Sequence, residues 1–155
     1  MSRIRNSRLR CYVIGDGPDR GKLENAACAL GLKGQVVFTG RQDNVADWLS
    51  ILDVFVLPSD SGESFGNAAV EAMAVGIPTI VMADGGGLVE HFPPGYRDFP
   101  RNERELGQRI AELLSNSAYA ERMAEACNQY VREKYSVTRM LAGYEALYES
   151  ALQGR

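Results

Sequence analysis

Short apolar runs alternate with amphipathic segments along the N-terminal part of the chain. The apolar runs cover residues 9–14, 35–39, 54–57 and 78–82. Apolar residues recur at helical spacing over residues 22–30, 45–52 and 67–75. Short runs bounded by glycine or proline predict strands, and the helical spacing predicts helices between them. This alternation predicts an α/β fold with a parallel sheet and crossover helices on its faces.

The composition becomes charged and rich in alanine beyond residue 100, where three helices are expected. They cover residues 103–114, 118–133 and 137–152. We interpret four tyrosines in this region as helix-packing residues: Tyr130, Tyr135, Tyr144 and Tyr148. With 155 residues, of which 45% are hydrophobic and 24% charged, the chain is expected to form a single domain over residues 1–155. Residues 1–8 are expected to be frayed.

The formal net charge of −3 gives no electrostatic support for general binding to nucleic acid. Basic side chains do gather near the start, at Arg3, Arg5, Arg8 and Arg10. No apolar run approaches the roughly 18 residues that a membrane span needs, and no signal-peptide core follows the basic start. We therefore expect a cytoplasmic protein that binds no nucleic acid and is at most peripheral to the inner face of a membrane.

The sequence shows no pattern typical of a metal site or of a disulfide framework. Cys11, Cys28 and Cys127 are odd in number, far apart and without CxxC spacing, so we interpret them as core or surface thiols. The single histidine, His91, stands close to two prolines. It is interpreted as structural or solvent-exposed rather than as a base, and we expect neither a metal nor another cofactor.

A glycine-containing loop, Gly15-Asp16-Gly17-Pro18, follows the first predicted strand. Glycines at a strand-to-helix junction can let a phosphate approach the backbone and the helix N-terminus. The loop has no third glycine at the Rossmann spacing and no lysine-serine pair of a P-loop. These absences favour a tight strand-to-helix turn with Pro18 at the helix start.

Two glutamates, Glu63 and Glu71, bracket a turn-like Ser64-Phe65-Gly66 between an apolar run and an alanine-rich helix. Such junctions are where open α/β sheets hold ligands. A carboxylate can accept two hydrogen bonds from a vicinal diol, and the free amides of a helix start suit a diphosphate. Taken alone, either glutamate would be interpreted as a loop or surface acid. Together, and in this position, they indicate a nucleotide-sugar site.

Six segments, in order along the chain, resemble the donor-binding half of group 1 glycosyltransferases, which are enzymes of carbohydrate biosynthesis. They are residues 15–18, 36–40, 53–59, 63–74, 76–78 and 86–90. These retaining enzymes have the GT-B fold, in which two Rossmann-like domains flank the active site. The resemblance implies the C-terminal, donor-binding half: a Rossmann-like parallel sheet with helices on both faces and a helical C-terminus.

The resemblance also implies roles for individual residues. Glu63 corresponds to the family glutamate that contacts the donor sugar and is the candidate catalytic residue, whereas Glu71 corresponds to the glutamate that binds the ribose diol. The other implied donor-binding residues lie beside them, in the loop next to the nucleobase and in the first glycine loop: Ser64, Phe65, Gly66, Asn67, Ala68, Thr39, Gly40, Arg41, Gly15 and Gly17.

The implied reaction transfers a sugar from a UDP-, GDP- or ADP-sugar to an acceptor, with retained anomeric configuration and without a catalytic metal. Family members have, before the equivalent of Leu9, a strand and helix whose arginine and lysine neutralise the donor diphosphate, and an acceptor-binding domain. We expect both to be absent here. Charge-assisted hydrogen bonds worth roughly 1.5–3 kcal/mol each would be lost, so the chain alone is expected to bind the donor weakly and to be inactive.

Two other functions stay open at this stage. One is a stand-alone nucleotide-sugar-binding module that acts with a separately encoded acceptor-domain partner. The other is a non-catalytic remnant, for which replacement of Glu63 and Glu71 by glutamine would change no binding. An exposed sheet edge near Leu9 also predicts weak self-association.

Overall fold

The computed structural model describes residues 9–59, 63–83, 86–96 and 99–153. The predicted fraying of residues 1–8 therefore lies outside the described residues. The chain divides into two units, Met1–Ile51 and Leu52–Arg155, and each is described by itself. The prediction of a single domain over the whole chain stays a prediction.

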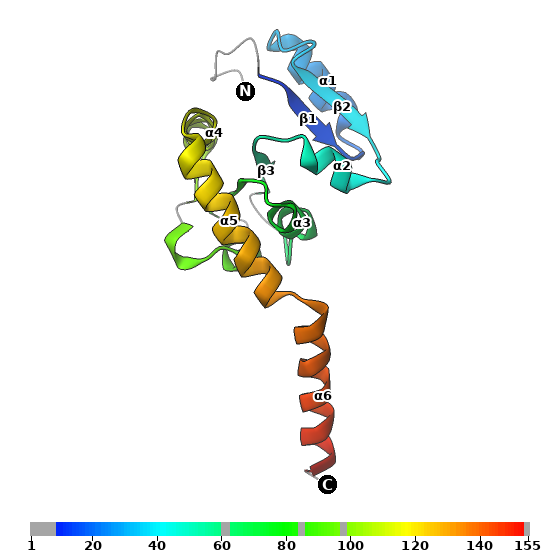
Figure 1. The fold of residues 1–155 in the computed structure, drawn as a ribbon. Coiled ribbons are helices and arrows are strands. Elements are labelled where there is room, and N and C mark those ends of the chain that lie inside the picture. Colours follow the sequence, from blue (N-terminus) through cyan, green and yellow to red (C-terminus); the bar gives the residue numbers. More distant parts are fainter. Residues whose placement is uncertain (1–8, 60–62, 84–85, 97–98, 154–155) are drawn as a thin grey trace. The chain divides into compact units, whose positions relative to one another are not determined.

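The first unit is a strand-helix-strand unit followed by a short helix (Figure 1). Its elements are β1 (Cys11–Ile14), α1 (Arg20–Ala29), β2 (Val36–Gly40) and α2 (Val45–Ser50). β1 and β2 pair in parallel, with Cys11 opposite Val36. The rings of Tyr12 in β1 and Trp48 in α2 pack with their centroids 5.7 Å apart, which ties the short helix to the first strand.

The second unit starts with another strand-helix-strand unit and continues into helices (Figure 1). Its elements are β3 (Phe55–Leu57), α3 (Asn67–Val75), β4 (Thr79–Val81), the 3₁₀ helices η1 (Gly86–His91) and η2 (Pro94–Tyr96), α4 (Glu103–Ser115), α5 (Ser117–Lys134) and α6 (Val137–Gln153). β3 and β4 pair in parallel, with Phe55 opposite Thr79. All three residues of β4 are buried, as expected for a parallel strand that is covered on both faces.

The core of the second unit forms between β4, α3, η1 and one face of α5. The most deeply buried apolar members are Ala69, Met73, Val81, Leu88, Phe92 and Cys127. The amide side chain of Asn128 in α5 donates hydrogen bonds of 2.9 and 2.8 Å to the carbonyls of Met73 and Ala74. The carbonyl of Met73 also accepts from the amide of Gly76, so Asn128 chiefly supplies a partner for the carbonyl of Ala74, which the helix end leaves unsatisfied.

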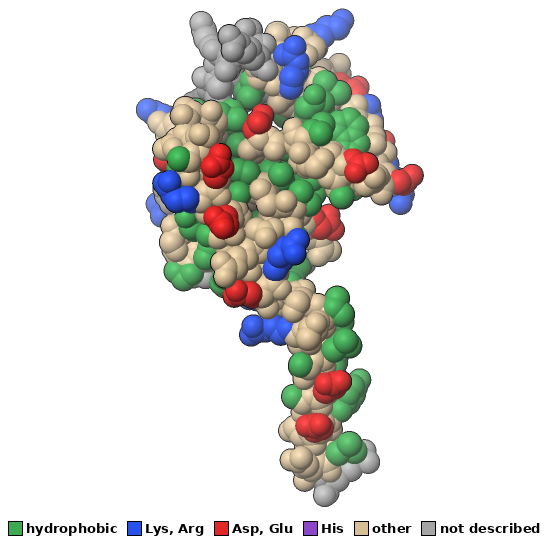
Figure 2. All heavy atoms as spheres, viewed as in Figure 1, with side chains coloured by type: hydrophobic (Ala, Val, Ile, Leu, Met, Phe, Trp, Pro, Cys, Tyr) green, Lys and Arg blue, Asp and Glu red, His purple; other side chains and the backbone are tan. Residues whose placement is uncertain are grey.

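The three C-terminal helices confirm the sequence prediction, but they differ in how much they bury. Asn102 caps α4 by accepting hydrogen bonds from the amides of Arg104 and Glu105, and α5 contributes five buried residues. No residue of α6 is buried. Its apolar side chains are exposed along the helix (Figure 2). Tyr144 and Tyr148 stack on each other within α6, with ring centroids 6.5 Å apart, and both stay exposed. They are therefore not core residues, and their packing against another helix stays a prediction.

The predicted α/β class and the parallel pairing of strands are confirmed. The strands form two two-stranded sheets, β1-β2 and β3-β4, one in each unit. Each sheet is one strand-helix-strand unit, because the crossover helix brings the second strand beside the first in parallel. Among the described residues, no further strand pairs with either sheet.

Candidate functional site

The loop between β3 and α3 carries the motif that the sequence singles out. Residues 63–66 are called the donor loop below, after the donor-binding role that the family resemblance predicts for them. Gly66 adopts a left-handed conformation, with φ of 74°, immediately before α3. Its amide donates a 3.1 Å hydrogen bond to Glu63 Oε1. The carboxylate of Glu63 therefore folds back over its own loop with one oxygen, while Oε2 makes no hydrogen bond to any described residue.

Two glycines of η1 lie directly against the donor loop. A Cβ atom on Gly86 would come 2.7 Å from the carbonyl oxygen of Glu63, and one on Gly87 would overlap the carbonyl oxygen of Ser64. Gly86 also has a φ of 66°. Only glycine fits this approach of two backbones, so the Gly86-Gly87 pair sets how closely η1 supports the donor loop.

The first turn of α3 presents free amides. The amides of Ala69 and Val70 both donate to the carbonyl of Gly66, at 3.0 and 3.3 Å. Those of Asn67 and Ala68 have no acceptor among the described residues, and both residues are exposed. Unpaired amides at a helix N-terminus carry partial positive charge and bind anions.

Glu71 lies one turn into α3 and is exposed. It follows Asn67 by four residues and Ala68 by three, a spacing that places side chains on one helical face. The second unit thus brings together the Glu63 loop, the two free amides and the Glu71 carboxylate on adjoining parts of one loop-helix junction. The placement of Glu63 in the loop and of Glu71 in the helix agrees with the sequence prediction, and the roles of these residues in binding a donor stay predictions.

The other predicted site residues lie in the first unit, where β1 and β2 end together. The amide of Gly15 donates a 2.9 Å hydrogen bond to the carbonyl of Gly40, and both glycines have positive φ, 118° and 69°. The hydroxyl of Thr39 lies within donating distance of two carbonyl oxygens, that of Gly40 at 3.1 Å and that of Val13 at 3.3 Å. Arg41 is exposed. The first unit therefore brings Gly15 next to Gly40.

The glycine loop after β1 is held as a turn. The Asp16 side chain accepts a 2.8 Å hydrogen bond from the amide of Gly17 and lies 3.7 Å from the Arg20 guanidinium. This geometry agrees with the tight-turn interpretation. The helix begins at Arg20, two residues later than a helix start at Pro18 would place it, and Asp19 precedes it without a side-chain capping hydrogen bond.

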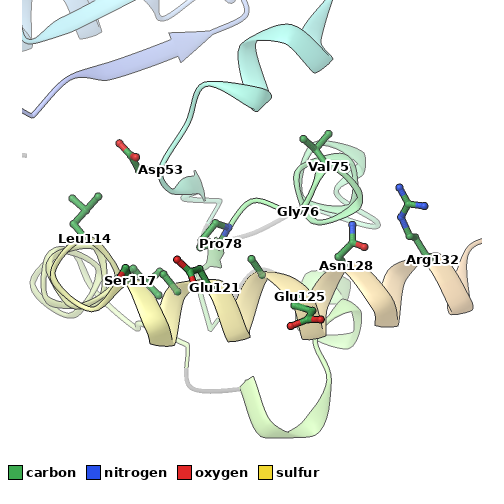
Figure 3. Close-up of a pocket in the computed structure, with 13 residues that line it drawn as sticks. Asp53, Val75, Gly76, Pro78, Leu114, Ser117, Glu121, Glu125, Asn128 and Arg132 are labelled. Carbon is green, nitrogen blue, oxygen red and sulfur yellow. The ribbon is translucent and has the colours of Figure 1, made fainter.

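A separate hollow of about 860 Å³ lies in the second unit between α5, α4 and the end of α3 (Figure 3). Asp53 and Pro78 line it, and they immediately precede β3 and β4. The hollow is therefore at the amino ends of these strands. The donor loop follows the carboxyl end of β3, where α/β sheets hold ligands, so the hollow is not part of the candidate site.

The described residues include no group of three or more His, Cys, Asp or Glu side chains that could hold a metal ion. Within the same residues, no helix is long and apolar enough to cross a membrane.

The chain belongs to the family described as glycosyl transferases group 1, whose model matches residues 1–133. It is 30% identical over 146 residues to the N-acetyl-alpha-D-glucosaminyl L-malate synthase of Bacillus anthracis, an alignment that covers 93% of this chain and 38% of that protein. It is 32% identical over 157 residues to the lipopolysaccharide core biosynthesis glycosyltransferase LpsD of Rhizobium meliloti, covering 100% of this chain and 45% of that protein. The chain thus spans less than half the length of these relatives.

Solved structures establish the fold. The chain superposes on Alr3699/HepE of Anabaena in complex with UDP with a TM-score of 0.85 at 20% identity, covering 94% of this chain and 42% of that one. A glycosyltransferase of Rickettsia africae gives a TM-score of 0.86 at 23% identity, covering 99% and 43%. The fold is that of GT-B glycosyltransferases, as the resemblance implies.

Gly86, Gly87 and His91 have no site role among the predictions made from the sequence. The three consecutive glycines at 85–87 are the signal that could have revealed the close backbone approach. His91 is buried, with 3% of its surface exposed, so the structure selects the structural interpretation over the solvent-exposed one. No pattern in the sequence reveals its partners, because they lie 26 and 44 residues away along the chain.

Proposed function

We propose that this chain is the donor-binding part of a retaining glycosyltransferase that takes its sugar from a nucleoside-diphosphate sugar. The observation that carries the proposal is the loop-helix junction at residues 63–71, where free amides and two carboxylates adjoin. Support comes from Alr3699/HepE of Anabaena, whose structures contain UDP, UDP with glucose, or UDP-glucose. The relatives named above are a synthase and a glycosyltransferase.

Each part of the junction suits one part of such a donor. The amides of Asn67 and Ala68 donate to the diphosphate, and the exposed carboxylate of Glu71 accepts two hydrogen bonds from the ribose diol. Glu63 Oε1 is occupied by the amide of Gly66, which leaves Oε2 to accept a hydrogen bond from the donor sugar. Thr39, Gly40 and Arg41 serve the nucleobase, and Gly15 and Gly17 shape the wall of the site.

Catalysis in this proposal rests on positioning the sugar and on stabilising the departing diphosphate through the helix amides. No catalytic metal is invoked. The acceptor is bound by a second domain or partner, and the proposed location is the cytoplasm. Transfer itself needs that second domain, so the property to measure on this chain is donor binding.

Titration calorimetry with UDP, GDP, ADP and their glucose conjugates tests the proposal. We expect saturable binding of at least one of them, and Glu71→Gln should weaken it about tenfold, because a charge-assisted hydrogen bond is worth roughly 1.5–3 kcal/mol. Glu149→Gln, which makes the same change at an exposed position of α6, should leave the affinity unchanged. The proposal is wrong if none of the nucleotides binds at millimolar concentration, or if Glu71→Gln binds as tightly as the control.

A further inference from the structure

The donor loop has a buried side as well as an exposed one. His91 lies at the centre of the buried side. His91 ends η1 and is buried. Its Nε2 atom lies 2.5 Å from the carbonyl oxygen of Phe65 in the donor loop, and its Nδ1 atom lies 2.5 Å from the hydroxyl of Tyr135. The three rings also pack on one another, with centroids 4.6 Å apart for Phe65 and His91 and 5.2 Å apart for the other two pairs.

The partners determine where the imidazole proton lies. A carbonyl oxygen can only accept, so Nε2 of His91 must carry a proton and donate it to Phe65. With one ring proton, Nδ1 then accepts from the hydroxyl of Tyr135. Tyr135 therefore holds the tautomer in which His91 can donate to the loop.

Further contacts hold both ends of this series of hydrogen bonds in place. Leu88 and Phe92, on either side of His91 in sequence, are fully buried. Lys134 donates a 2.9 Å hydrogen bond to the carbonyl of Glu90 and lies over the Tyr135 ring, 5.3 Å from its centroid. Its hydrogen bond with Tyr135 raises the pKa of Lys134. His91 and Tyr135 therefore form a rigid support at the junction of η1 with the end of α5.

The carbonyl that His91 holds belongs to the same peptide unit as the amide that holds Glu63. The Phe65 carbonyl and the Gly66 amide lie on one rigid plane; the carbonyl accepts from His91, and the amide donates to Glu63 Oε1 at 3.1 Å. Any rotation of this plane away from His91 also turns the Gly66 amide away from the Glu63 carboxylate.

We propose that His91, with Tyr135 behind it, is a positioning residue that orients the 65–66 peptide and thereby aims the Glu63 carboxylate at the donor sugar. This inference rests on the proposed function of the donor loop. The nucleoside end of the site depends on Glu71 and on the amides of Asn67 and Ala68, which α3 holds in place. Loss of the support should therefore weaken binding of the sugar more than binding of the nucleotide.

Three variants and a matched control test this inference on the full chain. Tyr135→Phe keeps the ring but removes the hydroxyl, and His91→Leu removes both hydrogen bonds. His91→Gln restores an N–H donor and an acceptor. Tyr119→Phe is the control, because it removes another half-buried α5 hydroxyl, one that accepts from Arg109. For each variant, dissociation constants for UDP-glucose and UDP and amide exchange at Gly66 are measured. The imidazole ¹⁵N spectrum of His91, the single histidine, is recorded for the wild type, Tyr135→Phe and Tyr119→Phe.

We expect the wild-type ring to show the Nε2-protonated tautomer. Tyr135→Phe and His91→Leu should weaken UDP-glucose binding about tenfold and UDP binding less than about threefold. Both should also speed amide exchange at Gly66. His91→Gln should recover much of the lost affinity for UDP-glucose, and Tyr119→Phe should match the wild type. Equal losses of affinity for UDP-glucose and UDP, or the same loss of affinity in Tyr119→Phe, would overturn the inference.

The two proposals fail separately. If the wild type binds none of UDP, GDP, ADP and their glucose conjugates, the proposed function fails, and amide exchange at Gly66 then decides the inference without any ligand. Exchange that is the same in Tyr135→Phe and Tyr119→Phe shows that His91 does not orient the 65–66 peptide. If the wild type binds both nucleotides and no variant changes the binding, the proposed function stands and the positioning role does not.

Discussion

Cys127 in α5 shows how burial changes the chemistry of one side chain. It has no exposed surface, and desolvation by burial raises the pKa of its thiol from 9.0 to about 12. The thiolate is the reactive form of cysteine. Cys28, by contrast, is exposed, so the two thiols should differ sharply in reactivity.

The stability contributed by Cys127 should depend on pH. Because the pKa is raised in the folded chain, this contribution is fully present below pH 9.0 and is lost as the pH rises from 9.0 towards about 12. Within that window, the free energy of unfolding should fall by about 1.4 kcal/mol for each pH unit. Urea unfolding of the wild type and of Cys127→Ala at several pH values measures it, since the alanine variant has no thiol to ionise.

We expect Cys127→Ala to be less stable than the wild type at neutral pH, by about 1 kcal/mol for the cavity it leaves, and the difference to shrink above pH 9.0. A difference that stays constant up to about pH 11 would show that the folded chain does not protect this thiol from ionisation. In the same series, a thiol reagent should label Cys28 readily and Cys127 only on unfolding.

At the scale of elements, the start of α3 depends on one glycine. A Cβ atom on Gly66 would overlap the side chain of the buried Leu88, and its φ of 74° is unfavourable for other residues. Gly66→Ala should therefore lower the free energy of unfolding by more than about 2 kcal/mol. Chemical denaturation, followed by circular dichroism, measures the change.

Gly107 in α4 is the matched control for that substitution. No atom lies within 4 Å of the position its Cβ would take, and it lies inside a regular helix. Gly107→Ala should raise the free energy of unfolding by about 0.5–1 kcal/mol. If the two alanine substitutions change the free energy of unfolding in the same direction, then η1 does not approach the start of α3 as closely as the structure indicates.

The order and type of the strands and α-helices could be predicted from the sequence, because each apolar run and each helical spacing reflects local geometry, whereas the 3₁₀ helices η1 and η2 were not predicted. The position of Glu71 one turn into a helix could be predicted for the same reason. Contacts between distant segments could not. Tyr135 and Tyr144 are both interpreted from the sequence as helix-packing residues, yet Tyr135, at the C-cap of α5, contacts His91, and Tyr144 in α6 is exposed. The contact of Tyr135 depends on the packing of η1 against α5, which no local pattern reveals.

At the scale of the whole molecule, the chain divides into two units, and each contains one strand-helix-strand unit and some of the predicted site residues. Gly15, Thr39 and Gly40 lie at the strand ends of the first unit, and the 63–71 junction lies in the second. The sequence indicates both sets through the ordered motifs of the family. It does not indicate the division into two sheets, since strand pairing depends on which edges meet rather than on the pattern within a strand.

The central claim is that the start of α3 binds the diphosphate of a nucleotide sugar. Backbone ¹H–¹⁵N correlation spectra recorded during a titration with UDP-glucose test it most directly. We predict saturable shifts at the amides of Asn67 and Ala68 that need a higher UDP-glucose concentration in Glu71→Gln. Unchanged Asn67 and Ala68 amides at millimolar UDP-glucose, UDP, GDP and ADP would contradict the claim.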